Sequence, residues 1–379
     1  MIYCDQAATS WPKPAEVIEA VTRSLADGPG SPGRSAHQGA LTAARLVFSA
    51  REALAELLGV EEWDRIVFTL NVTMALNLAF SGLLSPGDHV LTTAFEHNSV
   101  MRPLMRLARE RGVRVSLVGP GPDGLVGAEG FARRRRKDTR LAVVNHASNV
   151  TGALAPLAEI KAALGPVPLV VDTAQSAGVI PLAPAGRFCD VLAFTGHKGL
   201  LGPTGTGGLW VRPGLDIRPL VQGGTGSRSE REEQPDFLPD ALEAGTPNTH
   251  GLAGLAAGIR FVLATGVQRI REHELGLTRD FLAGLAGIRG AQVYGPRDPE
   301  RRTAVISLNL AGWSPSDLAL ALDREFGIMT RAGLHCAPRV HRTLGTFPQG
   351  VVRFSFGWFN TSDEVGRVLE ALGKLSRRV

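Results

Sequence analysis

Short apolar runs alternate with longer amphipathic segments from about residue 60 onward. A short run bounded by polar residues is typical of a buried strand, whereas apolar positions that recur every three or four residues are typical of a helix. The pattern predicts strands at Arg65–Thr69, His89–Thr93, Arg114–Val118, Leu141–Asn145, Leu169–Asp172 and Val191–Thr195. It predicts helices at Thr73–Leu84, Ser99–Arg111 and Leu157–Leu164.

This alternation predicts an α/β fold whose mostly parallel sheet is covered on both faces. Such sheets gather functional residues at the carboxyl ends of their strands, so the polar residues after each strand are the candidates for chemistry. The segment Gly223–Gly245 is rich in Gly, Ser, Arg, Glu and Pro and predicts a long loop. A helix near Gly251–Thr265 follows, and a second strand-and-helix unit leads us to place a domain boundary near residue 260.

The composition is that of a globular protein, with 44% hydrophobic and 20% charged residues among 379. The net charge of +5 comes mainly from arginines spread along the chain, because only five lysines are present. We expect the densest basic run, from Arg133 to Lys137, on the solvated side of a helix, and we predict no nucleic-acid binding.

The start of the chain lacks a basic-then-apolar signal pattern, and the apolar stretch Gly251–Gly266 is interrupted by Arg260. The three cysteines, Cys4, Cys189 and Cys336, are odd in number and widely spaced. They predict neither a disulfide framework nor a metal site, and they favour a reducing compartment. We therefore expect a soluble, cytoplasmic protein that makes no membrane contact.

Lys198 and Asp172 each stand at the end of a predicted strand. A lysine at a strand end, followed by a glycine-rich stretch, can form a Schiff base with a carbonyl cofactor, but it can also be a surface lysine in a turn. Asp172 ends a very apolar strand, where a carboxylate is costly unless it is paired. The ring nitrogen of pyridoxal phosphate would be such a partner, and the cap of a following helix is the alternative.

The polar residues at two further strand ends each allow a cofactor-binding and a structural interpretation. Thr73 opens a predicted helix, where its hydroxyl and the first amides would suit a phosphate, although an ordinary N-cap explains it equally well. His97 follows another strand, where a flat imidazole could stack on a flat cofactor ring or act as a structural hydrogen-bonder.

Cys336 lies in a segment that its Gly and Pro neighbours predict to be a loop. A nearby cation or imidazole favours the thiolate, and Arg331 and His335 are the candidates for that role. A small buried cysteine is the alternative, and it is the interpretation we give to Cys4 and Cys189. Arg353 begins a strand-like run, where its planar fork suits a substrate carboxylate or simply faces solvent.

Several motifs along the chain resemble those of the class V aminotransferase superfamily. They are Tyr3-x-Asp5-x-Ala7-Ala8-Thr9, Glu96-His97, His146-Ala147-Ser148-Asn149-Val150-x-Gly152, Asp172-x-x-Gln175, His197-Lys198, Glu243-Ala244-Gly245-Thr246-Pro247-Asn248 and Arg353-Phe354-Ser355. Each motif is weak alone, but their order over nearly the full length is specific. The chain resembles a cysteine desulfurase or selenocysteine lyase, and its compact cysteine loop is similar to that of the second group of cysteine desulfurases.

The resemblance implies a fold-type-I enzyme that binds pyridoxal 5'-phosphate and forms a homodimer with active sites at the subunit interface. The expected architecture is a large domain, residues 15–260, with a seven-stranded sheet. A smaller C-terminal α/β domain spans residues 261–379, and residues 1–14 pack with it.

The resemblance also assigns roles to individual residues. Lys198 matches the lysine that holds the cofactor, Asp172 the partner of its ring nitrogen, Gln175 the residue at its phenolic oxygen, and His97 the stacking histidine that also relays protons. The phosphate contacts are matched by Thr73, Thr195 and His197, with Thr246 reaching the neighbouring subunit's cofactor.

Substrate contacts follow in the same way. Asn149 lies beside cofactor and substrate, Arg353 binds the α-carboxylate, and Arg331 assists. Cys336 would accept sulfur from L-cysteine as a persulfide and pass it to an acceptor protein, for instance in iron–sulfur cluster assembly. L-selenocysteine as substrate, an aminotransferase or epimerase reaction, and a sulfur-carrier scaffold with a vestigial cofactor site are the alternatives.

Overall fold

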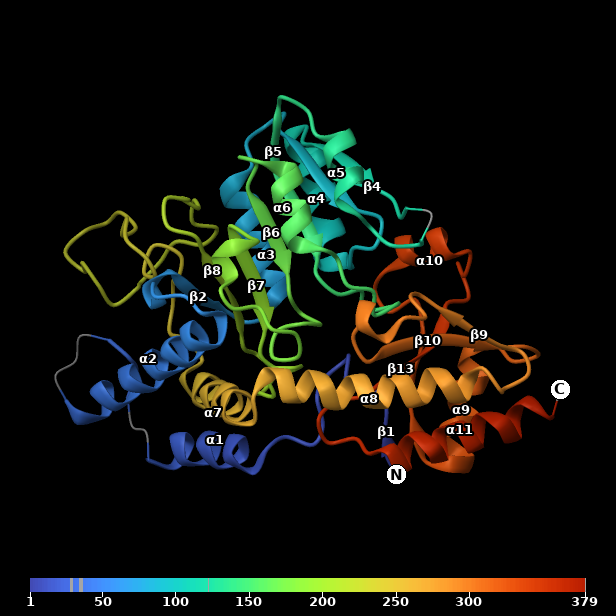
Figure 1. Cartoon of the computed structure of the whole chain (residues 1–379). Coiled ribbons are helices and arrows are strands. Elements are labelled where there is room, and N and C mark those ends of the chain that lie inside the picture. The colour runs from blue at the N-terminus through green and yellow to red at the C-terminus, as the bar shows by residue number, and fades with distance from the viewer. Residues whose placement is uncertain (28–29, 34–36, 122, 379) are drawn as a thin grey trace.

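The structure is a computed structural model that describes residues 1–27, 30–33, 37–121 and 123–378. A seven-stranded sheet forms its centre, in the order β2-β8-β7-β6-β5-β3-β4 (Figure 1). Only β8 runs against the others, because it pairs antiparallel with both β2 and β7. The strands are β2 (Ile66–Thr69), β3 (His89–Thr93), β4 (Arg114–Val118), β5 (Thr139–Asn145), β6 (Leu169–Asp172), β7 (Val191–Thr195) and β8 (Gly207–Val211).

Helices cover both faces of this sheet, as the near-continuous apolar strands require. Neighbouring residues of one strand point to opposite faces, so Val170 packs with helices α3 and α4 while Val171 packs with α2, α6 and α7. The helices of this part are α1 (Ala15–Asp27), α2 (Gln38–Leu58), α3 (Val72–Leu83), α4 (Asn98–Arg111), α5 (Ala128–Arg134), α6 (Leu157–Leu164) and α7 (Thr249–Thr265).

The C-terminal part has its own antiparallel sheet, in the order β12-β13-β10-β9, and its own apolar core. Ile2 and Cys4 from the N-terminal segment belong to this core, and β1 (Ile2–Tyr3) pairs with β11 (Ile328–Met329). The strands are β9 (Ala291–Tyr294), β10 (Val305–Leu310), β12 (Arg331–Gly333) and β13 (Val351–Ser355). The helices are α8 (Val267–Leu285), α9 (Pro315–Phe326), α10 (Pro338–Leu344) and α11 (Ser362–Ser376), and short 3-10 helices stand at Trp63–Arg65, Ala185–Arg187 and Pro299–Arg301.

The predicted strands and helices of the large sheet are confirmed to within a few residues. The helices α1 and α2 and the strand β8 were not predicted, and β8 begins in a stretch whose glycines favour a loop. The segment Gly223–Gly245 holds neither helix nor strand, as expected. The expectation for the basic run is only half right, because α5 ends at Arg134 and the other three residues lie beyond it, all exposed.

The domain boundary near residue 260 falls inside α7, which ends at Thr265, and the division stays a prediction. Within the described residues no single helix is long and apolar enough to cross a membrane. The bent pair α7 and α8 passes that test by length and composition only.

Candidate active site

The carboxyl ends of the parallel strands bring the predicted residues to one edge of the large sheet. Lys198 follows β7, Asp172 ends β6, Asn149 follows β5, and His97 follows β3 and opens α4. The turn that carries Lys198 packs tightly on the segment after Asp172, where an added Cβ on Gly178 would lie 2.3 Å from a backbone oxygen of this turn. The φ of 82° at Gly178 also favours glycine.

Lys198 is not the surface lysine of the alternative reading, because it is partly buried and lines a cavity. Burial lowers the pKa of its amine to about 8, and the opposing carboxylate of Asp172 limits that shift. The positive charges of Arg353 and Arg331 lower the pKa further. A lysine with a lowered pKa is more often a free amine at neutral pH, which is the form that attacks a carbonyl.

Asp172 is buried and caps no helix, since the residues after it form turns. Its carboxylate accepts hydrogen bonds from the backbone N–H of Ala174 at 2.9 Å and from the Ser99 hydroxyl at 3.4 Å. Burial raises its pKa, while these bonds and the nearby Lys198 work in the other direction. Such a carboxylate gains from a cationic partner in the pocket.

His97 caps helix α4 through its ring. Its Nδ1 accepts the backbone N–H of Ser99 at 3.0 Å and lies 2.8 Å from the Ser99 hydroxyl. Burial, and then the charge of Lys198, lower its pKa to about 4, so the ring is neutral at pH 7. Because Nδ1 accepts, the proton sits on Nε2. The structural reading of His97 is thus correct, and it leaves Nε2–H as a donor.

Two buried polar atoms near Lys198 have no hydrogen-bond partner in the described chain: the Thr195 hydroxyl and the Nδ1 of His197. The backbone carbonyl of His197, by contrast, accepts from Ser10 N–H at 3.0 Å and from Lys13 Nζ at 3.0 Å. Buried polar groups are normally satisfied, so unpaired ones at the edge of a site point to a bound group.

The two other predicted phosphate contacts, Thr73 and Thr246, are exposed. The N-cap reading of Thr73 is wrong, because the cap of α3 is Asn71, whose side chain accepts from Met74 N–H at 3.0 Å. The Thr73 hydroxyl is therefore left in the first turn of the helix without a capping role.

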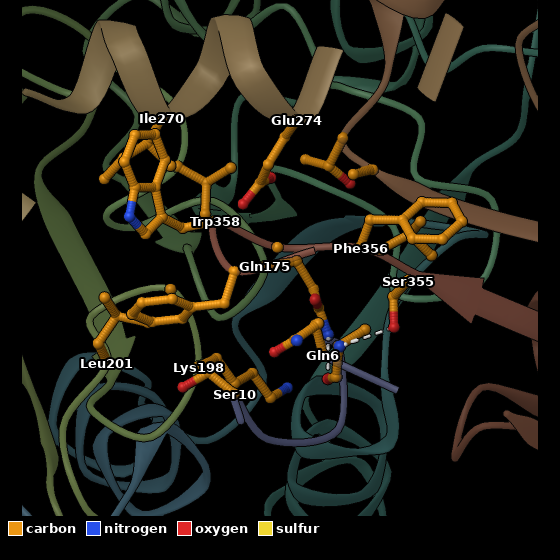
Figure 2. A pocket seen from close by; sticks show the side chains of 18 of the residues that line it. Gln6, Ser10, Gln175, Lys198, Leu201, Ile270, Glu274, Ser355, Phe356 and Trp358 are labelled. Carbon is orange, nitrogen blue, oxygen red and sulfur yellow. Dashed lines mark hydrogen bonds between the residues drawn. The ribbon is translucent and has the colours of Figure 1, made fainter. Parts of the chain in front are cut away.

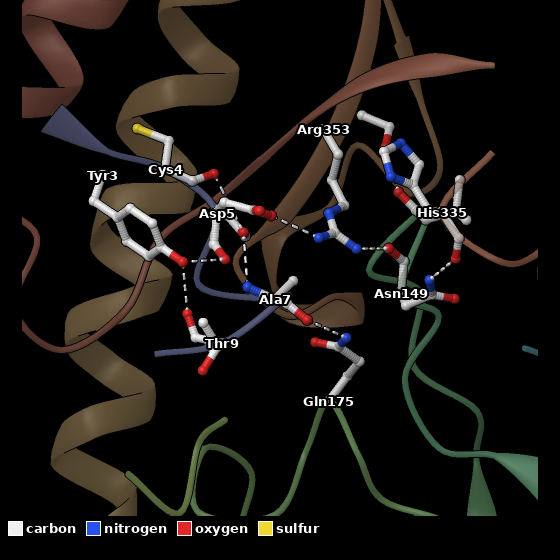
Figure 3. A network of polar contacts seen from close by, with 12 residues as sticks. Tyr3, Cys4, Asp5, Ala7, Thr9, Asn149, Gln175, His335 and Arg353 are labelled. Carbon is white, nitrogen blue, oxygen red and sulfur yellow. Dashed lines mark hydrogen bonds and ion pairs between the residues drawn. The ribbon is translucent and has the colours of Figure 1, made fainter. Parts of the chain in front are cut away.

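The N-terminal segment reaches this edge as well. Gln175 donates to the carbonyl of Ala7 at 3.0 Å, and both residues line the cavity beside Lys198. Arg353 is only 2% exposed, so the surface reading is wrong, and its Nη2 pairs with the Asp5 carboxylate at 2.7 Å (Figure 3). Its Nη1 donates to the carbonyl of Asn149 at 3.0 Å, and its Nε has no partner in the described chain.

The loop of Cys336 is held against Asn149, which follows β5, and Asn98, which begins α4. His335 and Cys336 both have left-handed backbones, with φ of 48° and 55°. The carbonyl of His335 accepts from the Asn149 side chain at 2.7 Å, and that of Cys336 from the Asn98 N–H at 2.8 Å. Non-glycine residues in this conformation persist where the surroundings enforce it, often at functional sites.

Cys336 is exposed, whereas Cys4 and Cys189 are buried, which confirms the predicted contrast among the cysteines. His335 is wrong as a cation for the thiolate: burial, and then the charge of Arg353, lower its pKa to about 2. Arg331 is exposed on β12, where it stands opposite Arg353 in the register of β12 and β13. Arg331 is therefore the charged candidate that remains.

A cavity lies behind Lys198, between the N-terminal segment, the large sheet and α8 (Figure 2). Ser10, Gln175, Trp358 and Glu274 are among the residues that line it, and Figure 2 shows the Glu274 carboxylate pointing inward. Burial raises the pKa of Glu274 to about 8, so this side chain keeps its proton at neutral pH.

Sequence reasoning missed Ser99, Asp5 and Glu274. The first could have been found from the His-x-Ser pattern at a helix start, and Asp5 stands inside a recognised motif but without an assigned role. Glu274 carries no local signal. No group of three or more His, Cys, Asp or Glu that could hold a metal occurs in the part of the chain that the structure describes.

The geometry defines an α/β fold with a partly buried lysine, a buried carboxylate and a neutral histidine at the carboxyl edge of its sheet. The family model for class-V aminotransferases matches residues 2–368, and the chain belongs to that family. A probable cysteine desulfurase of Methanothermobacter thermautotrophicus is 35% identical over 99% of this chain and 94% of its own length. A cysteine desulfurase of Escherichia coli is 31% identical over 100% of this chain and 94% of its own.

The structural comparison agrees. A cysteine desulfurase from Thermococcus onnurineus superimposes with a TM-score of 0.92 and 33% identity, covering 100% of this chain and 95% of that one. The expected fold-type-I architecture, with a mostly parallel seven-stranded sheet and a smaller C-terminal part, is confirmed.

Proposed function

We propose that this protein is a cysteine desulfurase, which converts L-cysteine to L-alanine and leaves the sulfur on Cys336 as a persulfide. The relatives named above support the reaction class. The observation that carries the proposal is the exposed Cys336 in a left-handed loop, which hydrogen bonds from Asn98 and Asn149 hold at the carboxyl edge of the large sheet. Transamination and epimerisation need no protein thiol.

The residues fit pyridoxal 5'-phosphate as the cofactor. The unpaired Thr195 hydroxyl and His197 Nδ1 suit its phosphate, and the buried Asp172 suits its protonated ring nitrogen. His97 would stack on the ring, and Gln175 would bind the phenolic oxygen. When bound, this cofactor withdraws electrons from the substrate's α-carbon.

Lys198 holds the cofactor and then takes the proton from the α-carbon, a task that suits an amine with a pKa near 8. Arg353 and Asn149 orient the substrate carboxylate, and Arg331 adds positive charge at the mouth. The Cys336 thiolate attacks the substrate's sulfur. The new S–S bond forms as the C–S bond breaks, and the electron pair stays on the substrate carbon, which is then protonated.

We further propose that the enzyme works as a homodimer in the cytoplasm. Exposed apolar side chains stand near the two exposed threonines in the sequence: Leu70 and Met74 flank Thr73, and Phe237 lies on the loop that leads to Thr246. Exposed apolar residues of this kind support an interface, through which Thr246 reaches the partner's cofactor. The persulfide then goes to an acceptor protein, for example in iron–sulfur cluster assembly.

The proposed function is tested with the variant Cys336→Ser. It is expected to keep the cofactor's visible absorbance and its change on addition of L-cysteine, because Lys198, Asp172 and Arg353 are untouched. Alanine formation from L-cysteine should fall at least a hundredfold, while Cys189→Ser, at a buried cysteine, should retain activity. Selenide release from L-selenocysteine is measured alongside to separate the lyase alternative. Undiminished alanine formation by Cys336→Ser would refute the proposal.

A further inference from the structure

The N-terminal segment places a carboxylate directly on the arginine of the site. Asp5 Oδ1 lies 2.7 Å from Nη2 of Arg353, and this side chain of Asp5 is itself only 20% exposed. The position of Asp5 is fixed by the backbone, because its neighbours form hydrogen bonds with β13. Cys4 accepts from Ser355 N–H at 2.8 Å, and Ala7 N–H donates to the Ser355 hydroxyl at 2.9 Å. The charge is thus built into the site.

Asp5 has two opposing effects on the binding of a carboxylate by Arg353: it orients the guanidinium, and it repels the carboxylate. Its hydrogen bond, together with the carbonyl of Asn149, holds the guanidinium in one orientation, in which the buried Nε–H has no partner among the described residues (Figure 3). Its negative charge also neutralises the arginine. A substrate carboxylate on the same guanidinium brings a second negative charge close to Asp5, and like charges at short range repel.

We propose that Asp5 is a positioning residue that also sets how tightly Arg353 holds the substrate's carboxylate, keeping that hold weak enough for the product to leave. This inference rests on the proposed role of Arg353 in binding the α-carboxylate. Asp5→Asn separates the orientation of Arg353 from the neutralisation of its charge, because asparagine keeps the oxygen that accepts from Nη2 and loses the negative charge.

The test is equilibrium binding to the holoenzyme, followed by the cofactor's visible absorbance. L-Alanine is compared with L-alaninamide, which lacks the carboxylate. The dissociation constant of L-alaninamide divided by that of L-alanine is the ratio that measures how much the carboxylate strengthens binding. Asp5→Asn is expected to tighten L-alanine binding roughly three- to tenfold and to leave L-alaninamide unchanged, as expected for loss of a partly screened repulsion. Asp5→Ser, also neutral but smaller, should shift the ratio in the same direction.

Asp138→Asn is the matched control. It removes the same charge from another 2.7 Å aspartate–arginine pair, the exposed one with Arg114, and should leave the ratio unchanged. Arg353→Gln should lower the ratio to about one. A ratio that stays high in Arg353→Gln would refute the role of Arg353. A ratio that collapses there but does not rise in either Asp5 variant would refute the inference about Asp5 alone.

Discussion

A buried histidine at the amino edge of the large sheet and two buried polar groups at its carboxyl edge differ in their hydrogen bonding. At the amino edge His89 is fully buried, and both ring nitrogens are satisfied, Nδ1 by the Thr139 hydroxyl and Nε2 by the Ser116 hydroxyl, each at 2.9 Å. At the carboxyl edge Thr195 and His197 have buried atoms without partners in the described chain. The first arrangement stabilises the fold, whereas the second is costly unless a bound group completes it.

The ion pairs of the two edges show the same contrast. Arg114 and Asp138 meet at 2.7 Å, and about half of each side chain is exposed, so solvent and salt screen the pair. Arg353 and Asp5 meet at the same distance, but the arginine is 2% exposed. Two ion pairs of equal length therefore differ in interaction energy, because burial decides how strongly a charge acts on its neighbours. The chemistry belongs at the carboxyl edge.

The largest effect should come from Lys198→Ala. Without this amine the cofactor cannot be attached, so activity should fall at least a thousandfold, and borohydride reduction should no longer fix the cofactor to the protein. Lys13 is the sharp control, because burial lowers the pKa of its amine to about 8 as well and it lies nearby. Mass spectrometry of the reduced protein checks the assignment, and cofactor found on Lys13 would overturn it.

The next effect concerns Glu274, the buried acid of the cavity. Its folded-state pKa of about 8 lies above the ordinary value of 4.5, so the folded protein holds this proton more tightly than the unfolded chain does. Stability from this group is therefore present below pH 4.5 and is lost as pH rises to 8. Glu274→Gln should flatten that decline and gain about 4 kcal/mol at pH 8. Urea unfolding at several pH values measures it; parallel curves for both proteins would contradict it.

The smallest effects should come from the two histidines. His89→Ala should cost about 2 kcal/mol of stability, because the buried Thr139 hydroxyl and the half-buried Ser116 hydroxyl both lose their histidine partner, and it should not alter cofactor affinity. His197→Ala should cost less than 1 kcal/mol, since its ring nitrogen has no partner to lose, but should weaken cofactor binding about tenfold. Urea unfolding and cofactor titration of both variants test this crossed pattern, and the reverse assignment of the two losses would break the comparison of the edges.

Local pattern was enough to predict much of the fold and part of the site. The strand ends at Thr69, Asp172 and Thr195 follow strongly apolar runs, so their positions and the shared edge were predictable. The strand β8 was not, because its leading glycines, Gly207 and Gly208, give a loop signal although they allow close backbone packing in the sheet.

The contacts of the site were harder to predict than its members. Asp5 and Arg353 are 348 residues apart, so no periodicity links them, and the pair exists only because β1 joins the C-terminal core. The neutrality of His335 depends on burial, which the polar neighbours of a short loop do not reveal. Sequence therefore indicated candidate residues for the site, and the fold determined their contacts and their charge.

The most direct test of the central claim is mass spectrometry of the wild-type protein after L-cysteine is added. We predict a mass increase of one sulfur atom on the peptide that contains Cys336, because this exposed cysteine is held at the carboxyl edge of the sheet. Burial raises the thiol pKa of Cys4 and Cys189, so both should stay unmodified. A sulfur adduct on either of those two cysteines and none on Cys336 would contradict the account.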